Sequence, residues 1–458
     1  METSTGPSPD ATNDSKTATA TLAGSASGGH GPGAPGGQAI QIYRAGRVVT
    51  VSPRGTIRDG AVAIKGDRFA AVGTWEEVAA QFPEAAASPS SMTDTGAEAT
   101  ICPGLIDCHA HNLEFGPGTA FGAAEEMQLV GAAELVFRAM RGGVTALGEQ
   151  VLGHCQFALG VESYRRFAAT LPITVAFSAG CVSVGTEPVT HLCSAKPGEP
   201  VTLDTLLREE TLECMAANTD YPGEHAMATI TPASLPPHLT PNAGKVFLKA
   251  LDLRRFVDAY HRAGRRSGMH IEGDQTARYY VKVGGDVIHH GHGLSPAVLR
   301  LMALCGVDLV ATPAGGTKSR PNSPAEILAA VEAGVRVSIA TDAVMPLHRD
   351  AGWYDCNGKA EGRRSILPGQ NVFSEDLAAV ARPALRLLSD HGLDENEALA
   401  LITRNPAEVL GRPGLTGTIE PGSQADFLVA SGIPGVEVAH ASAISRVVVR
   451  GKPAVVRS

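Results

Sequence analysis

The sequence predicts an α/β protein: a (β/α)8 TIM barrel with a small composite β-sandwich domain built from both ends of the chain. Three observations predict it. Strand-like and helix-like segments alternate through the middle of the 458 residues, as in parallel βα units. Short β-rich runs recur near both ends. Histidines and one aspartate follow several central strands, where a barrel carries its chemistry.

Composition narrows the class of protein. Hydrophobic residues make up 43% and charged residues 19%, the balance of a soluble globular enzyme. A net charge of −9 disfavours nucleic acid, which needs a dense basic surface. No apolar run approaches the roughly 20 residues that span a bilayer, and the eight cysteines form no CxxC pair. We therefore expect a cytoplasmic protein with a small-molecule or peptide substrate and no nucleic-acid or membrane partner. Whether it forms a homo-oligomer is left open.

Composition also divides the chain. Residues 1–37 are rich in Ser, Thr, Gly, Ala and Pro, which predicts a disordered tail. We expect residues 38–100 and 411–458 to form the two parts of the β-sandwich domain, and residues 101–410 to form the barrel. The β-rich runs of the sandwich are Ile40–Tyr43, Arg47–Val51, Ala61–Ile64, Phe69–Val72, Asp426–Val429 and Arg446–Gly451.

Eight strands are expected in the barrel, with helices between them, such as Thr205–Ala217 and Ser323–Ala333. The strands are Ile101–Cys108, Val144–Gly148, Ile173–Ala179, Ala226–Ile230, Gly268–Ile271, Asp286–His290, Asp308–Ala311 and Arg336–Thr341.

One segment, Lys245–Leu251, is compatible with either a strand or a helix, and a helix is favoured. Thr240 and Pro241 match an N-cap followed by proline at the first helical position. Val246 begins an apolar series at helical spacing. A strand here would also leave Ala226–Ile230 in surplus.

The sharpest chemical signal is the pair His109 and His111 at the end of the first barrel strand. Residues two apart on a strand point the same way, so both imidazoles can reach one cation. An isolated HxH is short and common, and would more often be two polar residues at a strand end. Its place after the first barrel strand favours a metal site.

Further histidines end the fifth and sixth strands. His270 alone would more often be a core histidine. His289, His290 and His292 crowd the next strand end, a density that indicates a site in a chain with 15 histidines. Alternation would place His290 and His292 on one face, leaving His289 a structural or supporting role.

Two acidic residues follow strands as well. Asp342 ends the eighth strand, where a carboxylate can both ligate a cation and shuttle protons, although an aspartate after a strand is usually a turn residue. Glu149 follows the second strand, and either a histidine partner or a structural salt bridge fits it.

Together these segments resemble the amidohydrolase superfamily, in its cytosine deaminase and imidazolonepropionase-like branch. The resemblance covers Gln38 to Pro453 and includes the PGLIDxHxH, IHHGHGLS and IATD segments, Thr403–Glu408 and Gly417–Gly422. It implies a composite β domain and a barrel whose catalytic metal, zinc or another divalent transition metal, is held by strand-end residues. The implied ligands are His109, His111, His270 and Asp342, and His290 would ligate the metal or orient the attacking water.

The expected number of metal ions depends on whether Lys249 lies on a strand or on a helix. In relatives with two ions a carboxylated lysine on the fourth strand bridges them, and Lys249 is the candidate. Because we place Lys249 on a helix, one ion is favoured over two.

The expected reaction is hydrolysis of a C–N bond by hydroxide generated on the metal, with Asp342 as general base and His290 or His292 steadying the oxyanion. Deaminases of this superfamily commonly carry a glutamate three residues after the fifth-strand histidine, where this chain has Gly273. An amide in a peptide-like or cyclic substrate is therefore favoured over a heterocyclic amine, although Glu272 and Asp274 flank the position.

Two long loops, Cys181–Pro200 and Pro346–Gln370, are candidate substrate walls. The second carries Trp353, Tyr354, Arg363 and Arg364, which suit a sizeable substrate with a carboxylate or peptide backbone. The chain resembles tailoring amidohydrolases of peptide natural products, such as the bottromycin type that removes a follower segment. A non-catalytic scaffold with an amidohydrolase fold is the alternative from another class, but such relatives lose metal ligands.

Overall fold

The computed structural model describes residues 39–113, 125–151, 161–179, 207–226, 228–229, 246–247, 250–315, 320–344, 351 and 370–457. The chain from Ala39 onward forms one compact unit. The predicted tail lies outside the described residues.

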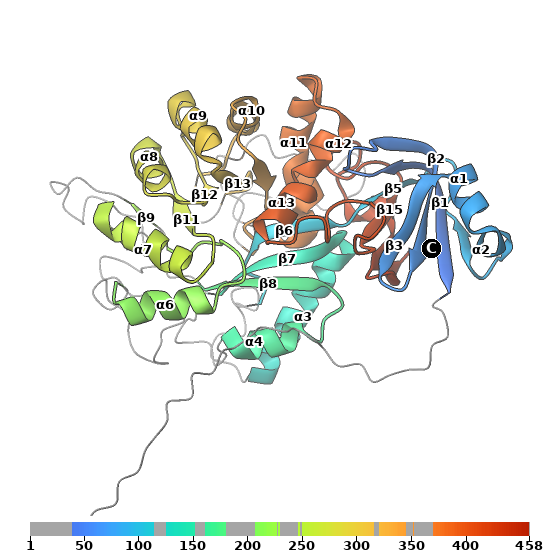
Figure 1. Cartoon of the computed structure of the whole chain (residues 1–458), viewed down its shortest axis with the longest axis horizontal. Coiled ribbons are helices and arrows are strands. Elements are labelled where there is room, and N and C mark those ends of the chain that lie inside the picture. The colour runs from blue at the N-terminus through green and yellow to red at the C-terminus, as the bar shows by residue number, and fades with distance from the viewer. Residues whose placement is uncertain are drawn as a thin grey trace, which may run out of the picture. The chain divides into compact units, whose positions relative to one another are not determined.

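Strands from both ends of the chain form one eight-stranded sheet, in keeping with the expected composite domain (Figure 1). β5 pairs antiparallel with β15, which joins the N-terminal part to the C-terminal part. These eight strands are linked by hydrogen bonds into one sheet, and the division into a β-sandwich domain stays a prediction. Its strands are β1 Ile40–Val49, β2 Thr56–Lys65, β3 Arg68–Thr74, β4 Met92–Asp94, β5 Thr100–Pro103, β15 Phe427–Ala430, β16 Ile444–Val449 and β17 Lys452–Val456.

The two faces of this sheet are covered differently. One face packs on α1, Trp75–Gln81, and α2, Pro83–Ala87, through a small apolar cluster. The other face holds an apolar cluster in which Tyr43 meets Phe427, with ring centroids 5.0 Å apart. The two ends of the chain are therefore held together by side-chain packing as well as by backbone hydrogen bonds.

The predicted strand Ile101–Cys108 is two strands that belong to different sheets. β5 stays in the composite sheet, and β6, Leu105–Ala110, starts the parallel sheets after Gly104. A Cβ added at Gly104 would lie 2.1 Å from Oγ1 of Thr145, so only glycine fits this crossing. The continuous apolar run hid the break, because both strands are fully buried.

Parallel strands make up the rest of the core, but the described residues show no closed barrel. They form a three-stranded sheet, a four-stranded sheet and a short pair (Figure 1). The strands are β7 Val144–Val151, β8 Thr174–Ala179, β9 Ala228–Thr229, β10 Val246–Phe247, β11 Gly268–Ile271, β12 Val287–His290, β13 Asp308–Ala311 and β14 Val337–Ile339.

Backbone contacts nevertheless join the first and last of these strands. Asp342 N–H donates to the carbonyl of His109 at 3.1 Å, and His111 N–H donates to the carbonyl of Ala343. Ala110 and Ala343 also form a parallel bridge. The chain after β14 therefore runs alongside β6, which brings the two ends of the parallel region together.

Helices lie between the parallel strands, as the alternating pattern predicts. α10 matches the predicted helix Ser323–Ala333, because Ser323 is its N-cap and Ala333 its C-cap. α6 matches the described part of Thr205–Ala217. The helices are α3 Glu125–Arg141, α4 Val161–Ala168, α6 Glu209–Ala217, α7 Ala250–Arg262, α8 Asp274–Lys282, α9 Pro296–Cys305, α10 Pro324–Glu332, α11 Leu377–Asp390, α12 Glu395–Ala400 and α13 Arg404–Val409, with 3-10 turns η4 Ser374–Asp376 and η5 Ala441–Ala443.

The prediction of a helix through Lys245–Leu251 is wrong at Val246–Phe247. These two residues are β10 and pair in parallel with β9, inside the predicted fourth strand. The helix α7 begins only at Ala250. Val and Phe favour extended backbone, and a neighbouring strand supplies the hydrogen bonds that helical periodicity alone cannot anticipate. Lys249 lies outside the described residues.

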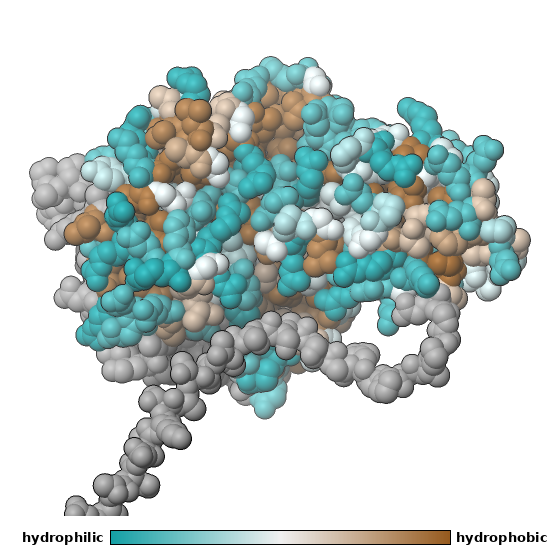
Figure 2. Space-filling model, viewed as in Figure 1, coloured by the Kyte–Doolittle hydropathy of each residue, from teal (hydrophilic) through white to brown (hydrophobic). Residues whose placement is uncertain are grey.

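One large apolar cluster fills the space between the parallel strands and their helices. The described part of the chain has no helix long and apolar enough to cross a membrane. On the face shown in Figure 2, hydrophilic residues cover much of the described surface, and hydrophobic residues show between them.

Candidate metal centre

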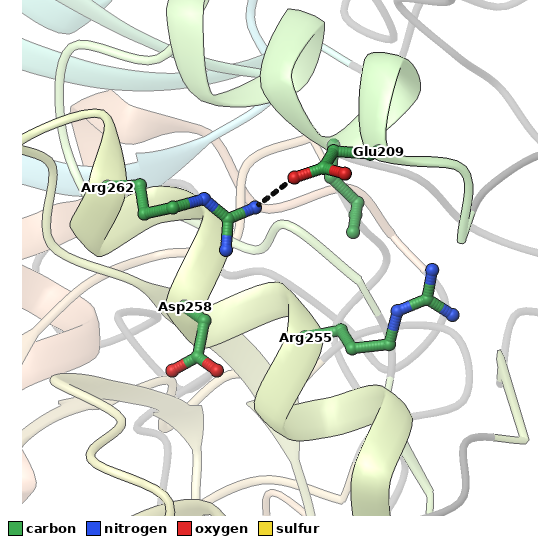
Figure 3. A pocket seen from close by; sticks show the side chains of 5 residues that line it. Glu209, Arg255, Asp258 and Arg262 are labelled. Carbon is green, nitrogen blue, oxygen red and sulfur yellow. Dashed lines mark hydrogen bonds and ion pairs between the residues drawn. The ribbon is translucent and has the colours of Figure 1, made fainter.

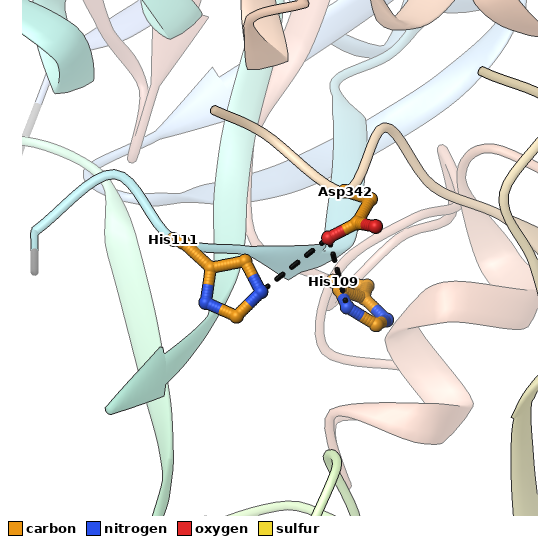
Figure 4. Close-up of side chains that lie close together, drawn as sticks. All are labelled: His109, His111 and Asp342. Atoms are coloured by element: carbon orange, nitrogen blue, oxygen red, sulfur yellow. Dashed lines mark ion pairs between the residues drawn. The ribbon is translucent and has the colours of Figure 1, made fainter. Parts of the chain in front are cut away.

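His109, His111 and Asp342 converge at the junction of β6 and the chain after β14 (Figure 4). One carboxylate oxygen of Asp342 lies 3.4 Å from Nε2 of His109 and 3.4 Å from Nε2 of His111. All three side chains are buried. The predicted pairing of the HxH motif with the aspartate after the eighth strand is therefore present in space.

These distances suit a shared cation. Two ligand atoms, each about 2.0–2.1 Å from one tetrahedral zinc ion, lie about 3.3 Å apart. Nε2 of His109 is buried and makes no hydrogen bond, an arrangement that is costly for a polar atom unless a ligand satisfies it. The three residues fit a divalent cation, with two imidazole nitrogens and one carboxylate oxygen as donors.

A second group adjoins the first and shares His109. It contains His109, Glu224 and His290. A Glu224 oxygen lies 2.7 Å from Nδ1 of His270 and 2.6 Å from Nε2 of His290, and the other lies 3.7 Å from Nε2 of His109. His270 therefore joins the cluster through Glu224 and through its ring contact with His290, 4.1 Å between centroids.

Hydrogen bonds define the proton positions on His290. A carboxylate only accepts, so Nε2–H of His290 donates to Glu224. Nδ1 of His290 then accepts the hydroxyl proton of Thr312, 2.7 Å away. Burial, together with the charge on His270, lowers the pKa of His290, which keeps it neutral. The two candidate metal-binding groups thus differ. In the group that contains His290 and Glu224, the proton on Nε2 of His290 lies between the two side chains.

The carboxylates of the cluster are ionised. Burial alone raises the pKa of Asp342, but the surrounding histidines, with a hydrogen bond from His111, outweigh it and hold that pKa well below its usual value. Burial likewise raises the pKa of Glu224, and the three histidines around it lower that pKa well below 4.5. Both groups can therefore bind a cation or accept a proton at neutral pH.

Two strand-end residues of the cluster have left-handed backbone. The φ angle is 67° at His290 and 56° at Asp342, where an L-residue is strained. Asp107 helps to hold the second of these turns, because its carboxylate accepts the hydroxyl of Thr341 at 2.5 Å and the backbone N–H of Thr341 at 3.1 Å. Both of these strained positions aim side chains into the cluster.

The alternation proposed for His290 and His292 ends at this turn. Gly291, with φ 61°, follows His290, and the side chain of His292 turns outward. Nδ1 of His292 lies 3.0 Å from a carboxylate oxygen of Glu326 on α10. His292 is thus separate from the cluster, and its predicted substrate-binding role stays a prediction.

Glu149 holds the chain that follows the HxH motif, and its expected role as a partner of a histidine or in a salt bridge stays a prediction. Its carboxylate accepts the backbone N–H groups of Asn112 and Leu113, at 3.0 Å and 2.6 Å. These residues directly follow His111, so Glu149 fixes the path of the chain that leaves the HxH motif.

The residues around Gly273 have different roles. Glu272 lies 3.7 Å from Nε2 of His270, on the side away from Glu224. Asp274 instead accepts the backbone N–H of Ser295 at 2.6 Å and begins α8. Only Glu272 of the two flanking acids stands beside the histidine cluster.

Glu224 is the residue that sequence reasoning missed. Gln150 accepts its backbone N–H at 2.9 Å, and Pro222–Gly223 passes so close to β11 that a Cβ at Gly268 would lie 2.2 Å from the Gly223 carbonyl. The available signal was an acidic residue after Pro-Gly, immediately before the predicted fourth strand. Residues before a strand are expected at the opposite end of a barrel, so the sequence pattern gives no reason to place Glu224 beside the strand-end histidines.

Several predicted site residues lie outside the described residues. They are Lys249, Trp353, Tyr354, Arg363, Arg364 and nearly all of the two long loops. A separate small hollow lies between α6 and α7 (Figure 3). Its lining includes Glu209 and Arg262, paired at 3.1 Å, and none of its lining residues belongs to the histidine cluster.

Relatives match nearly the whole chain. An imidazolonepropionase of Ralstonia nicotianae is 27% identical over 391 residues, covering 81% of this chain and 86% of the relative. One of Agrobacterium fabrum is 24% identical over 416 residues, covering 86% and 90%. The model of an imidazolonepropionase-like composite domain of bacteria matches residues 60–85, from β2 into α2.

Solved structures show the same fold at low identity. A Xaa-Pro dipeptidase with bound methionine has a TM-score of 0.63 at 16% identity, covering 91% of this chain and 99% of that one. An adenosine deaminase from Xanthomonas campestris with bound zinc has a TM-score of 0.60 at 19% identity, covering 91% and 93%. The chain thus has a TIM-barrel-like α/β fold with a composite domain.

A match to a family model shows to which family the chain belongs. The model of the amidohydrolase family matches residues 100–454, from β5 to the last strand. This range includes every histidine and carboxylate of the cluster described above. The chain therefore belongs to the amidohydrolase family and is a hydrolase that acts on carbon–nitrogen bonds.

Proposed function

We propose that the chain is a metal-dependent hydrolase that cleaves an amide C–N bond in a peptide-like or cyclic amide substrate. The observation that carries the proposal is the convergence of His109, His111 and Asp342, with Nε2 of His109 buried and without a hydrogen bond. A single divalent cation, zinc by the nature of its donors, would be held by these three side chains. The family is metal-dependent, which supports this assignment.

A bound divalent cation polarises a carbonyl oxygen and lowers the pKa of water from 15.7 towards about 7. The protein supplies the remaining functions. Asp342 is ionised and buried, so it can take the proton of the attacking water and return it to the leaving nitrogen. His290 is neutral and its ring is held by Thr312 and Glu224, so its Nε2–H would have to leave Glu224 before it could donate to the developing oxyanion.

Glu224 and Glu272 bracket the ring of His270, at 2.7 Å and 3.7 Å. Burial lowers the pKa of His270, but Glu224 and Glu272 together raise it to about 9. His270 therefore carries a proton at neutral pH until a cation displaces it, which favours the three-residue group as the first metal site. This supports one ion over two.

The relatives support amide chemistry. Two of them are named imidazolonepropionase, and one structural neighbour is named Xaa-Pro dipeptidase. We infer a substrate whose scissile amide lies in a small ring or a short peptide. Removal of a follower segment from a bottromycin-type peptide is the most specific form of this proposal. Unpaired thiols at Cys102, Cys108, Cys214 and Cys305 support a reducing compartment such as the cytoplasm.

Deamination of a heterocyclic amine is the second candidate. One observation favours it: Glu272 stands beside His270, where it could protonate a ring nitrogen. A structural neighbour is named adenosine deaminase. The two reactions differ in their products, since deamination releases ammonia and amide cleavage of a peptide releases a carboxylate and an amine.

The experiment compares purified protein before chelation, after chelation, and after zinc is restored. Metal content is measured by elemental analysis, and dipeptides including Xaa-Pro, cyclic imides, aminopurines and a peptide with a follower segment are offered as substrates. We expect one zinc per chain and amide cleavage that is lost and regained with zinc. Equal behaviour of chelated and zinc-loaded protein would instead support a non-catalytic scaffold, and prompt ammonia release from an aminopurine would support deamination.

A further inference from the structure

We propose that His289 fixes the tautomer of His109, so that Nε2 of His109 faces the metal site as an unprotonated donor. His289 is then a positioning residue, which acts on the site through His109. The inference rests on the proposed function, because it concerns the same metal centre.

The hydrogen bond between His289 and the backbone carbonyl of Pro222 determines where the proton of His289 lies. Nε2 of His289 lies 2.8 Å from the carbonyl oxygen of Pro222. A carbonyl can only accept, so the proton of His289 is on Nε2. His289 is fully buried, and its ring nitrogens face a carbonyl and another imidazole, which disfavours a charged ring. Nδ1 of His289 therefore carries a lone pair.

His109 takes the other side of this contact. The Nδ1 atoms of His109 and His289 lie 2.9 Å apart. Because Nδ1 of His289 has no proton, Nδ1–H of His109 must donate. As a metal ligand His109 must be neutral, with one N–H, so Nε2 of His109 keeps its lone pair, 3.4 Å from Asp342 and 3.7 Å from Glu224.

The other tautomer of His109 shows why its hydrogen bond to His289 matters. With its proton on Nε2, His109 would donate to Asp342 and occupy the position of a cation. The neighbouring carboxylates favour that tautomer, and the bond to His289 opposes it. Metal-ligating histidines usually donate their second ring nitrogen to a carbonyl or carboxylate. Here the acceptor is the imidazole of His289, which in turn donates to the carbonyl of Pro222.

The fold builds this contact specifically. His289 lies on β12 next to His270 in the register of β11, and its ring packs at 65° on that of His109 with centroids 4.9 Å apart. The carbonyl of Pro222 reaches His289 because β11 has glycine at position 268, where a Cβ would lie 2.3 Å from the Pro222 oxygen. Two separate chain segments are therefore shaped around one hydrogen-bond chain.

Two variants of His289 test the inference. His289→Gln keeps an amide N–H for Pro222 and an amide oxygen for His109, whereas His289→Leu keeps the bulk but no polar atom. His391→Leu, an exposed histidine on the C-cap of α11, is the matched control. Zinc affinity is measured by competition with a chromophoric chelator. The tautomer of His109 is measured in chelated, histidine-labelled protein by 15N NMR, with His109→Asn assigning the signal.

We expect His109 protonated on Nδ1 in the chelated wild type, and on Nε2 in His289→Leu. Zinc affinity should fall about 10–100-fold in His289→Leu, recover in His289→Gln and stay unchanged in His391→Leu. Protonation on Nε2 in the chelated wild type, or wild-type zinc affinity in His289→Leu, would overturn the inference. Failure of the wild type to bind zinc would instead refute the proposed function, while the NMR measurement on metal-free protein still decides the role of His289.

Discussion

Replacing Glu224 by glutamine should remove the proton that the metal-free protein holds on His270. Glu224 accepts from His270 at 2.7 Å and from His290 at 2.6 Å, and all three side chains are buried. Glutamine keeps the shape of the side chain and removes its charge. Burial, which lowers the pKa of His270, would then be opposed by Glu272 alone, and that pKa should fall from about 9 towards its usual 6.5.

The magnitude follows from the pKa difference. A shift from 6.5 to about 9 corresponds to about 3.4 kcal/mol of extra stability for the protonated form. A raised histidine pKa stabilises the folded state fully below pH 6.5 and loses this contribution as pH rises through 9. The free energy of unfolding of wild-type protein should therefore fall by about 1.4 kcal/mol per pH unit in this window, and that of Glu224→Gln should lack this fall.

The assay is urea unfolding of chelated protein at several pH values between 6 and 10. Glu332→Gln is the matched control, since Glu332 lies 3.8 Å from His391 and both side chains are exposed. Its pH dependence should follow that of the wild type. If wild type and Glu224→Gln lose stability with the same slope between pH 6.5 and 9, then Glu224 does not hold the proton on His270 and the electrostatic reasoning is wrong.

Three further predictions follow from buried and exposed groups. Asp342→Asn should lower kcat/KM by about 10²–10⁴-fold with zinc present in excess, and a rate near that of the wild type in steady-state assays would exclude Asp342 as the base. Burial lowers the pKa of His225 to about 3, so His225 destabilises the fold as pH falls from 6.5 towards 3, by about 2 kcal/mol at pH 5. His225→Phe should flatten this dependence in urea unfolding between pH 5 and 7, and an unchanged slope would contradict the assignment. Burial raises the pKa of Cys102 to about 12, whereas Cys305 is exposed. Iodoacetamide at pH 8 should therefore modify Cys305 in folded protein and Cys102 only after unfolding, as peptide mass spectrometry can show.

Much of the strand pattern was predictable because it depends on local composition. β11 and β13 match their predicted bounds, and α10 lies between the predicted Ser323 and Ala333 with its capping box present. The composite sheet was predictable for the same reason, since both ends of the chain carry β-rich runs. The sequence does not mark Gly104 as a boundary, because the strands on either side of it are both buried.

The orientation of side chains at strand ends could not be predicted. Alternation holds only while the backbone stays extended, and His290 and Gly291 leave that conformation with φ angles of 67° and 61°. His292 consequently turns to Glu326 instead of joining His290. Two backbone angles therefore decide which of these side chains face the cluster. The alternating pattern of a strand does not predict such angles.

The sequence by itself determined the family, the parallel βα order and the HxH and aspartate donors, because these depend on short motifs and on the spacing of strands. Only the tertiary structure decided that Glu224 stands among the histidines and that His289 contacts His109. Both depend on the close approach of Pro222–Glu224 to β11 and β12, and such an approach is fixed by packing between segments that are distant along the chain.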